Sequence, residues 1–194
     1  MRRTAIFRGI LIAMVVSLGA RSALEASTET WSGLGLDSDW TSNGNWSGAG
    51  GAGADDDLVF PLSASRKTNN NDFDNTRFHS IAINGPDYVI IGKKILLSAG
   101  IVLNNDQFGS PGITEQFSPA IDLDANQAFS GVHFALRLKG IIGLVGHTLT
   151  CNGAVIFDGT IAANGGFGTL VGVGDTTVNS NSPDFGTTNL NGVR

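Results

Sequence analysis

The alternation of apolar and polar residues is clearest in the segment 132–139, where its period is two. The apolar positions are Val132, Phe134, Leu136 and Leu138, and the intervening positions are His133, Ala135, Arg137 and Lys139. Because successive side chains of a strand point to opposite sides, this segment is predicted to be a strand with one face in the core and one in water.

Short apolar runs of the same kind recur from residue 58 onward, separated by Asn, Gly and Asp. Few stretches reach ten residues without such breakers, so helices are not expected beyond the N-terminus. The further predicted strands are 58–60, 78–83, 88–91, 95–97, 101–103, 121–123, 148–151, 154–157 and 160–163. These runs predict an all-β fold.

The spacing of the turns distinguishes two all-β architectures. Asn152-Gly153, Asp158-Gly159 and Asn164-Gly165 follow one another at intervals of six residues, and such pairs tolerate the left-handed backbone of tight turns. Strands this short suit the faces of a coil better than the hairpins of a sandwich. We therefore predict a right-handed β-solenoid (a parallel β-helix), with a β-sandwich as the alternative.

A segment rich in Trp, Ser, Asn and Gly precedes the first apolar run, and a boundary is expected near residue 55. Residues 27–57 are predicted to form an N-terminal cap region, and residues 58–194 a solenoid segment that is either complete or truncated at its C-terminus. Trp31, Trp40 and Trp46 are the candidate ligand contacts, because sugar rings stack on indole faces. The favoured interpretation is that they cover the open end of the first coil.

The first 26 residues have the pattern of a secretory signal peptide. A positive start, Met1–Arg8, is followed by the apolar run Gly9–Ala20, which is shorter than the roughly 20 residues needed to cross a bilayer. Cleavage is expected after Ser22 or after Ala26. The mature chain is therefore expected to be secreted or held at the cell surface, with no transmembrane span.

Charge and cysteine content restrict the partners and the means of stabilisation. Without residues 1–26 the chain keeps 8 basic and 16 acidic residues, a formal charge of about −8, which disfavours nucleic acid as a partner. The single cysteine, Cys151, permits no internal disulfide, so stability must come from packing and backbone pairing. Cys151 follows Leu149 at period two and is predicted to be a buried, unreactive side chain.

Two stretches resemble large bacterial surface proteins of the autotransporter-passenger type. The first combines Trp31-Ser32-Gly33, Trp40, Asn45-Trp46 and Asp57–Phe60, which is similar to a Trp-rich pattern that precedes a right-handed β-helix in those proteins. The second is the Gly- and Thr-rich tail 153–178. The resemblance implies an exposed stalk or adhesin-like segment, associated with the outer membrane if it is part of a longer autotransporter, and it carries over no catalytic residue.

Two groups of acidic residues were considered as sites. Asp55-Asp56-Asp57 offers oxygen ligands for calcium, although a solvated acidic turn before a strand is the favoured interpretation. Asp122 and Asp124 are predicted to share one strand face, as the paired carboxylates of pectin-cleaving β-helices do.

Other catalytic patterns are not matched. Polygalacturonases have an Asp pair, then Gly-His-Gly, then Arg-x-Lys, whereas here Arg137-Leu138-Lys139 precedes Gly146-His147-Thr148. His79, His133 and His147 lack a metal-binding spacing, and the sequence has no G-x-S-x-G elbow.

The sequence thus predicts an exported, non-enzymatic surface or secreted solenoid segment with a stalk or adhesin-like structural or binding role and no cofactor or metal. Its expected partners are surface glycans or other cell-surface proteins. The alternative is a carbohydrate-binding module or the remnant of a polysaccharide-active β-helix.

Overall fold

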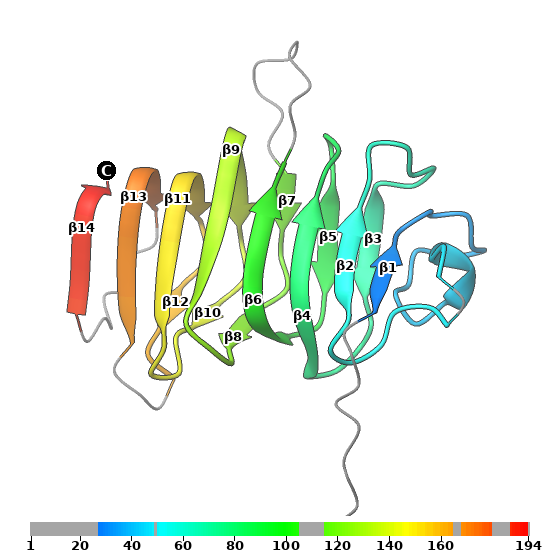
Figure 1. Ribbon diagram of the computed structural model, residues 1–194, viewed down its shortest axis with the longest axis horizontal. Helices are drawn as coiled ribbons and strands as arrows, with labels where there is room; N and C mark the ends of the chain where they lie inside the picture. The colour runs from blue at the N-terminus through cyan, green and yellow to red at the C-terminus, as the bar shows by residue number, and fades with distance from the viewer. Residues whose placement is uncertain (1–26, 49, 105–114, 165–167, 180–186, 194) are drawn as a thin grey trace, which may run out of the picture.

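The protein is a parallel β-solenoid of about five turns, as seen in a computed structural model (Figure 1). The structure describes residues 27–48, 50–104, 115–164, 168–179 and 187–193, without the side chains of 132–134 and 187–193. The predicted signal peptide, 1–26, lies outside the described residues. The predicted solenoid is confirmed, and the sandwich alternative is wrong, because all the pairs between the described strands are parallel.

The register of the strands defines three walls. The first wall consists, in order, of β1 (Thr28–Thr30), β2 (Asp57–Phe60), β4 (Thr76–Ile83), β6 (Ile95–Leu103), β9 (Gln127–Leu138), β11 (Thr148–Phe157), β13 (Thr169–Val178) and β14 (Thr187–Val193). The second consists of β3 (Thr68–Asn71), β5 (Val89–Gly92), β7 (Glu115–Phe117) and the C-terminal parts of β9, β11 and β13. The third consists of the N-terminal parts of β4 and β6, then β8 (Ile121–Leu123), β10 (Ile142–Gly143) and β12 (Ile161–Ala162).

Apolar side chains stack in columns inside these walls. Each turn of the chain places an apolar residue at the same position around the coil, stacked about 4.8 Å from its neighbour in the next coil. The column of the first wall is Leu58, Ile81, Ile101, Phe129 and Cys151. The column of the second is Ile90, Phe117, Leu138 and Phe157, and that of the third is Ile95, Ile121, Ile142 and Ile161. All are at most 1% exposed, so these columns form the core.

One predicted turn, Asn152-Gly153, is a bend within a strand. The runs 148–151 and 154–157 are both part of β11, which passes from the first wall to the second through Asn152-Gly153. Gly153 has a φ of 77°, and a Cβ there would collide with the carbonyl oxygen of Gly131 in the coil below. Glycine thus lets β11 bend from one wall to the next while it stays paired with the strand of the adjacent coil. A sequence pattern cannot distinguish such a bend from a turn between two strands.

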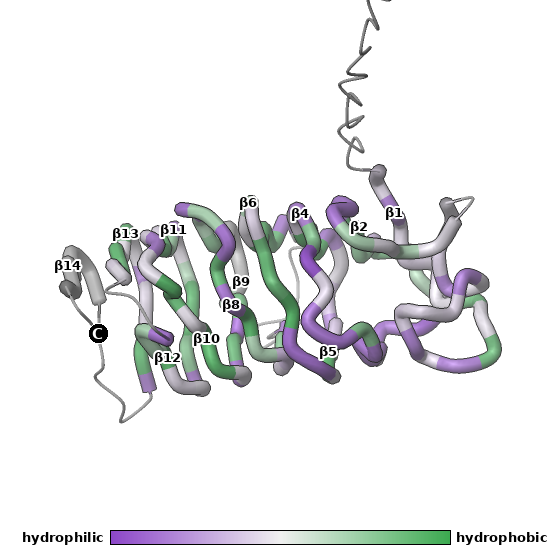
Figure 2. Tube along the Cα trace, turned by 90° about the horizontal axis from the view of Figure 1, so that it is seen from below, coloured by the Kyte–Doolittle hydropathy of each residue, from purple (hydrophilic) through white to green (hydrophobic). Residues whose placement is uncertain are grey.

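The Trp-rich segment continues the solenoid by a partial coil. β1 pairs with β2 in the first wall, and Asp39 forms a parallel bridge to Asn70 of β3 in the second. The short 3-10 helix η1 (Asn43–Asn45) lies between Asp39 and β2 in the chain. Residues 27–57 therefore share sheet and core with the first coil, and the loops of this segment project at one end of the molecule (Figure 2).

Candidate functional site

The three tryptophans are buried at this end of the core. Trp31 and Trp40 are 0% exposed and Trp46 is 5% exposed. The ring centroids of Trp31 and Trp46 are 5.1 Å apart with an edge-to-face geometry, and Trp40 lies 5.5 Å from Phe60 of the first coil. No indole face is open for the sugar contact considered for these residues, because each ring is packed against other core rings.

The indole nitrogens also have partners inside the protein. Trp31 Nε1 donates to the Arg66 carbonyl and Trp46 Nε1 to the Trp40 carbonyl, both at 2.7 Å. Trp40 Nε1 donates to the side-chain oxygen of Asn69, also at 2.7 Å. Trp31 and Trp40 therefore use both the apolar and the polar parts of their side chains to attach the N-terminal segment to the first coil, whereas the hydrogen bond of Trp46 lies within that segment.

The three consecutive aspartates before β2 point to three different partners. Asp55 forms an ion pair with Arg77 at 2.5 Å, which lowers the pKa of the Asp55 carboxyl. Asp57 contacts His79 Nδ1 at 2.7 Å, and Asp56 accepts a hydrogen bond from Ser27. Within the described part of the chain, no three His, Cys, Asp or Glu side chains are grouped to hold a metal ion. The structure does not bring the carboxylates of this run together as a calcium site.

Asp122 and Asp124 are likewise separated by their partners. Lys94 Nζ lies 2.8 Å from Asp122, and Asn164 Nδ2 donates to the same carboxylate at 3.1 Å. Asp124 instead pairs with Arg77 at 3.3 Å. Each carboxylate thus faces a cation from another coil, rather than a shared proton or water as in a pair of catalytic carboxylates.

Ser80, His79 and Asp57 meet near the edge of the first wall, but not in the order of a nucleophilic triad. The Ser80 hydroxyl donates to the Asp57 carboxylate, and His79 contacts that same carboxylate. In a triad the imidazole lies between the hydroxyl and the carboxylate, so that it can take the hydroxyl proton. Here the proton of Ser80 is directed at Asp57.

Arg137 is on the polar side of β9, as predicted, and Lys139 is exposed directly after the end of that strand. Arg137 pairs with Asp158 of the next coil, and Lys139 donates to Gln116 of the preceding coil at 2.6 Å. Hydrogen bonding from Arg137 lowers the pKa of Asp158. The side chain of His133 lies outside the described residues, so its predicted role stays a prediction.

Cys151 is buried in the first-wall column, as predicted. Burial raises the pKa of its thiol to about 12 because the apolar surroundings disfavour the thiolate. The thiol is therefore protonated and inert in the folded protein at neutral pH.

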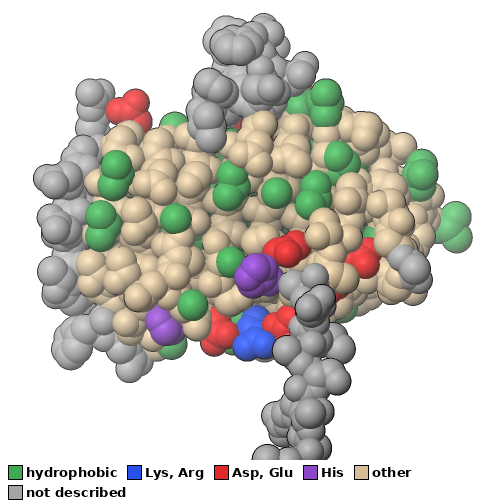
Figure 3. Space-filling view, viewed as in Figure 1, with side chains coloured by type: hydrophobic (Ala, Val, Ile, Leu, Met, Phe, Trp, Pro, Cys, Tyr) green, Lys and Arg blue, Asp and Glu red, His purple; other side chains and the backbone are tan. Residues whose placement is uncertain are grey.

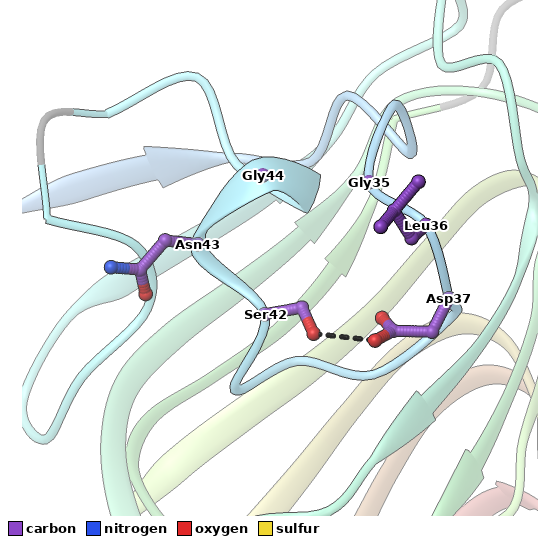
Figure 4. Close-up of a pocket in the computed structure, with 6 residues that line it drawn as sticks. All are labelled: Gly35, Leu36, Asp37, Ser42, Asn43 and Gly44. Atoms are coloured by element: carbon purple, nitrogen blue, oxygen red, sulfur yellow. Dashed lines mark hydrogen bonds between the residues drawn. The ribbon is translucent and has the colours of Figure 1, made fainter.

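A shallow cavity of about 360 Å³ lies in the N-terminal segment, and no motif in the sequence signals it. It is lined by Gly35–Asp37 and Ser42–Gly44 (Figure 4). Ser42 Oγ donates to the Asp37 carboxylate at 2.8 Å and lowers its pKa, while the Leu36 side chain is fully exposed. Two of the six lining residues are glycines, and the Asp37 carboxylate already accepts a hydrogen bond from Ser42, so the cavity has few polar groups left to bind a ligand.

Figure 3 shows how charged residues are distributed over the first wall. Basic and histidine side chains and several acidic ones lie in the lower half of this face, other acidic side chains lie near its upper left corner and toward its right, and the rest carries mostly uncharged side chains with scattered apolar ones. Among the described residues, no helix has the length and apolar content to cross a membrane. No family model, curated protein or solved structure matches the chain.

Proposed function

We propose that this chain is an exported, non-enzymatic β-solenoid segment that serves as a stalk or adhesin-like structural element at the cell surface. The observation that carries the proposal is the use of charged side chains to connect coils. Arg77 lies between Asp55 and Asp124, Lys94 pairs with Asp122, and Arg137 pairs with Asp158. These contacts run along the solenoid axis, parallel to the apolar columns.

This arrangement suits a load-bearing or spacing role. In a solenoid each coil contacts only its neighbours, so the stability of the whole depends on every interface between coils. Columns of stacked apolar side chains supply most of that stability, and surface ion pairs add a smaller contribution. The predicted signal peptide supports placing this rod outside the cytoplasm.

The carbohydrate-binding alternative is less well supported. Its main basis was the aromatic platform, and Trp31, Trp40 and Trp46 are buried. Its second basis was a carboxylate pair, and Asp122 and Asp124 contact cations from other coils. A glycan array and a titration of Trp fluorescence would test it directly, and a saturable response to a polysaccharide would favour it over the structural role.

Export is testable with the full chain carrying a C-terminal epitope tag in a Gram-negative host. We expect the tag in the periplasm, on the surface or in the medium. Val15→Asp, which places a charge in the apolar run of the leader, should leave the protein in the cytoplasm, whereas Val15→Leu should not. Cytoplasmic retention of all three proteins would contradict the proposal.

A further inference from the structure

Two carboxylates converge beneath the glycine-rich loop of the N-terminal segment. Glu29, in the middle of β1, is 6% exposed, and Asp56, directly before β2, is 8% exposed. The Ser27 hydroxyl lies 2.7 Å from Asp56 Oδ1 and 3.4 Å from Glu29 Oε1. Because a hydroxyl has one proton, Ser27 donates to the nearer carboxylate and leaves Glu29 with little compensation.

The Glu29 carboxylate is only partly satisfied by the residues that the structure describes. Glu29 Oε2 has no hydrogen-bond partner among the described residues, and within that same part of the chain neither Glu29 nor Asp56 forms an ion pair. Asp55 and Asp57, which flank Asp56, both face a basic side chain. An ionised carboxylate that is buried without a partner is strongly unfavourable, so this pair calls for a cation.

The backbone is shaped around these oxygens. A Cβ at Gly48 would collide with both carboxylate oxygens of Glu29, so a larger residue there would displace this side chain from its present position. The Gly53 amide donates to Asp56 Oδ2 at 2.7 Å, which leaves Asp56 Oδ1 on the side of Ser27 and Glu29. The result is a set of carboxylate and hydroxyl oxygens under a glycine-rich loop.

We propose that Glu29, Asp56 and Ser27 bind a calcium ion. Calcium accepts carboxylate, hydroxyl, carbonyl and water oxygens in irregular arrangements, whereas magnesium demands a nearly ideal octahedron and keeps more of its water. The ion neutralises the buried pair and links β1 to the start of β2. It thereby holds the Trp-bearing segment on the first coil, a role independent of whether the chain is exported.

The test is thermal unfolding of the purified, chelator-treated full chain at constant ionic strength with increasing free calcium. Above the dissociation constant, each tenfold increase in calcium should raise the Tm by roughly 3–6 °C. Glu29→Gln keeps the shape but removes the charge and should abolish this rise. Asp124→Asn, which removes an exposed carboxylate, is the matched control and should retain it.

A second measurement reports binding without reference to stability. Terbium, a luminescent substitute for calcium, should bind the wild-type chain and be sensitised by excitation of the nearby tryptophans. Added calcium should displace the terbium and remove this luminescence. Glu29→Gln should show no sensitised luminescence. Three results would overturn the proposal: no calcium response in the wild type, an equal response in Glu29→Gln, or a Glu29→Gln variant that is more stable than the wild type regardless of calcium.

Discussion

The indole N–H of Trp40 donates to the side-chain oxygen of Asn69 at 2.7 Å, and both side chains are 0% exposed. Trp40 belongs to the N-terminal segment and Asn69 to β3, the first strand of the second wall. This buried hydrogen bond joins the two parts where apolar packing alone would not fix their relative orientation.

A double-mutant cycle should reveal this coupling. Asn69→Leu leaves the Trp40 N–H buried without an acceptor and should lower the free energy of unfolding by about 1–3 kcal/mol. Trp40→Phe removes the donor and should also destabilise the protein. If the bond matters, the double variant should lose less than the two single losses combined, as measured by urea unfolding. Strict additivity would contradict the coupling.

The Cys151 thiol should resist alkylation in the folded protein. Its folded pKa of about 12 exceeds the ordinary thiol value of 9.0, so its labelling rate should stay low as the pH rises through 9, whereas the urea-unfolded chain should be labelled rapidly. Because the unfolded thiol loses its proton first, stability from this group is intact below about pH 9 and decreases between pH 9 and 12. Rapid labelling of native protein near neutral pH would show that the column is open.

Two glycines with similar backbone angles should respond differently to alanine. Gly146 has a φ of 83° with open space around it, so Gly146→Ala should cost only the left-handed strain, about 1–2 kcal/mol. Gly153 has a φ of 77° and faces the Gly131 carbonyl of the adjacent coil, so Gly153→Ala should cost more because the coils must move apart. Urea unfolding of both variants measures the difference, and equal losses would mean that the corner can relax.

The ion pair between Arg137 and Asp158 should make a small, salt-sensitive and pH-dependent contribution. Hydrogen bonding from Arg137 lowers the folded pKa of Asp158 below the ordinary carboxyl value of 3.8, so the stabilisation is present above that pH and is lost as the pH falls through the lowered folded pKa. The difference in urea midpoint between wild type and Asp158→Asn should therefore shrink in acid and in high salt. Asp175→Asn, at an exposed position of β13, is the control, and a difference that is constant with pH would contradict this role.

The predicted strands show where sequence reasoning succeeds. The alternation around Leu136 and Leu138 and the run Ile121–Leu123 are both found in strands, because local period-two patterning follows directly from a buried wall. β3 was missed because its inward residues, Asn69 and Asn71, are polar. Asn69 Oδ1 accepts from the Trp40 indole and Asn71 Nδ2 donates to the Lys93 carbonyl, and both partners are more than 20 residues away.

The candidate sites show the opposite balance. Residue types suggested a sugar contact for the tryptophans and metal-binding or paired carboxylates for the aspartates, but the rings are buried and the carboxylates face separate partners. The favoured interpretation of the tryptophans as a cover of the first coil, and the burial predicted for Cys151 from its apolar neighbour at period two, agree with the structure. Glu29 was missed because an isolated glutamate between two threonines has no distinguishing sequence signal. Its inward position follows from its register opposite Leu58.

The sequence by itself determined that the chain is built from short strands with an apolar core and no disulfide, because these properties depend on local periodicity and composition. Only the tertiary structure decided which residues stack on one another in adjacent coils, how the tryptophans are packed against the first coil, and which acidic and basic side chains form ion pairs. Those relationships join residues one or more coils apart, and the uneven length of the coils hides them from any fixed spacing along the chain.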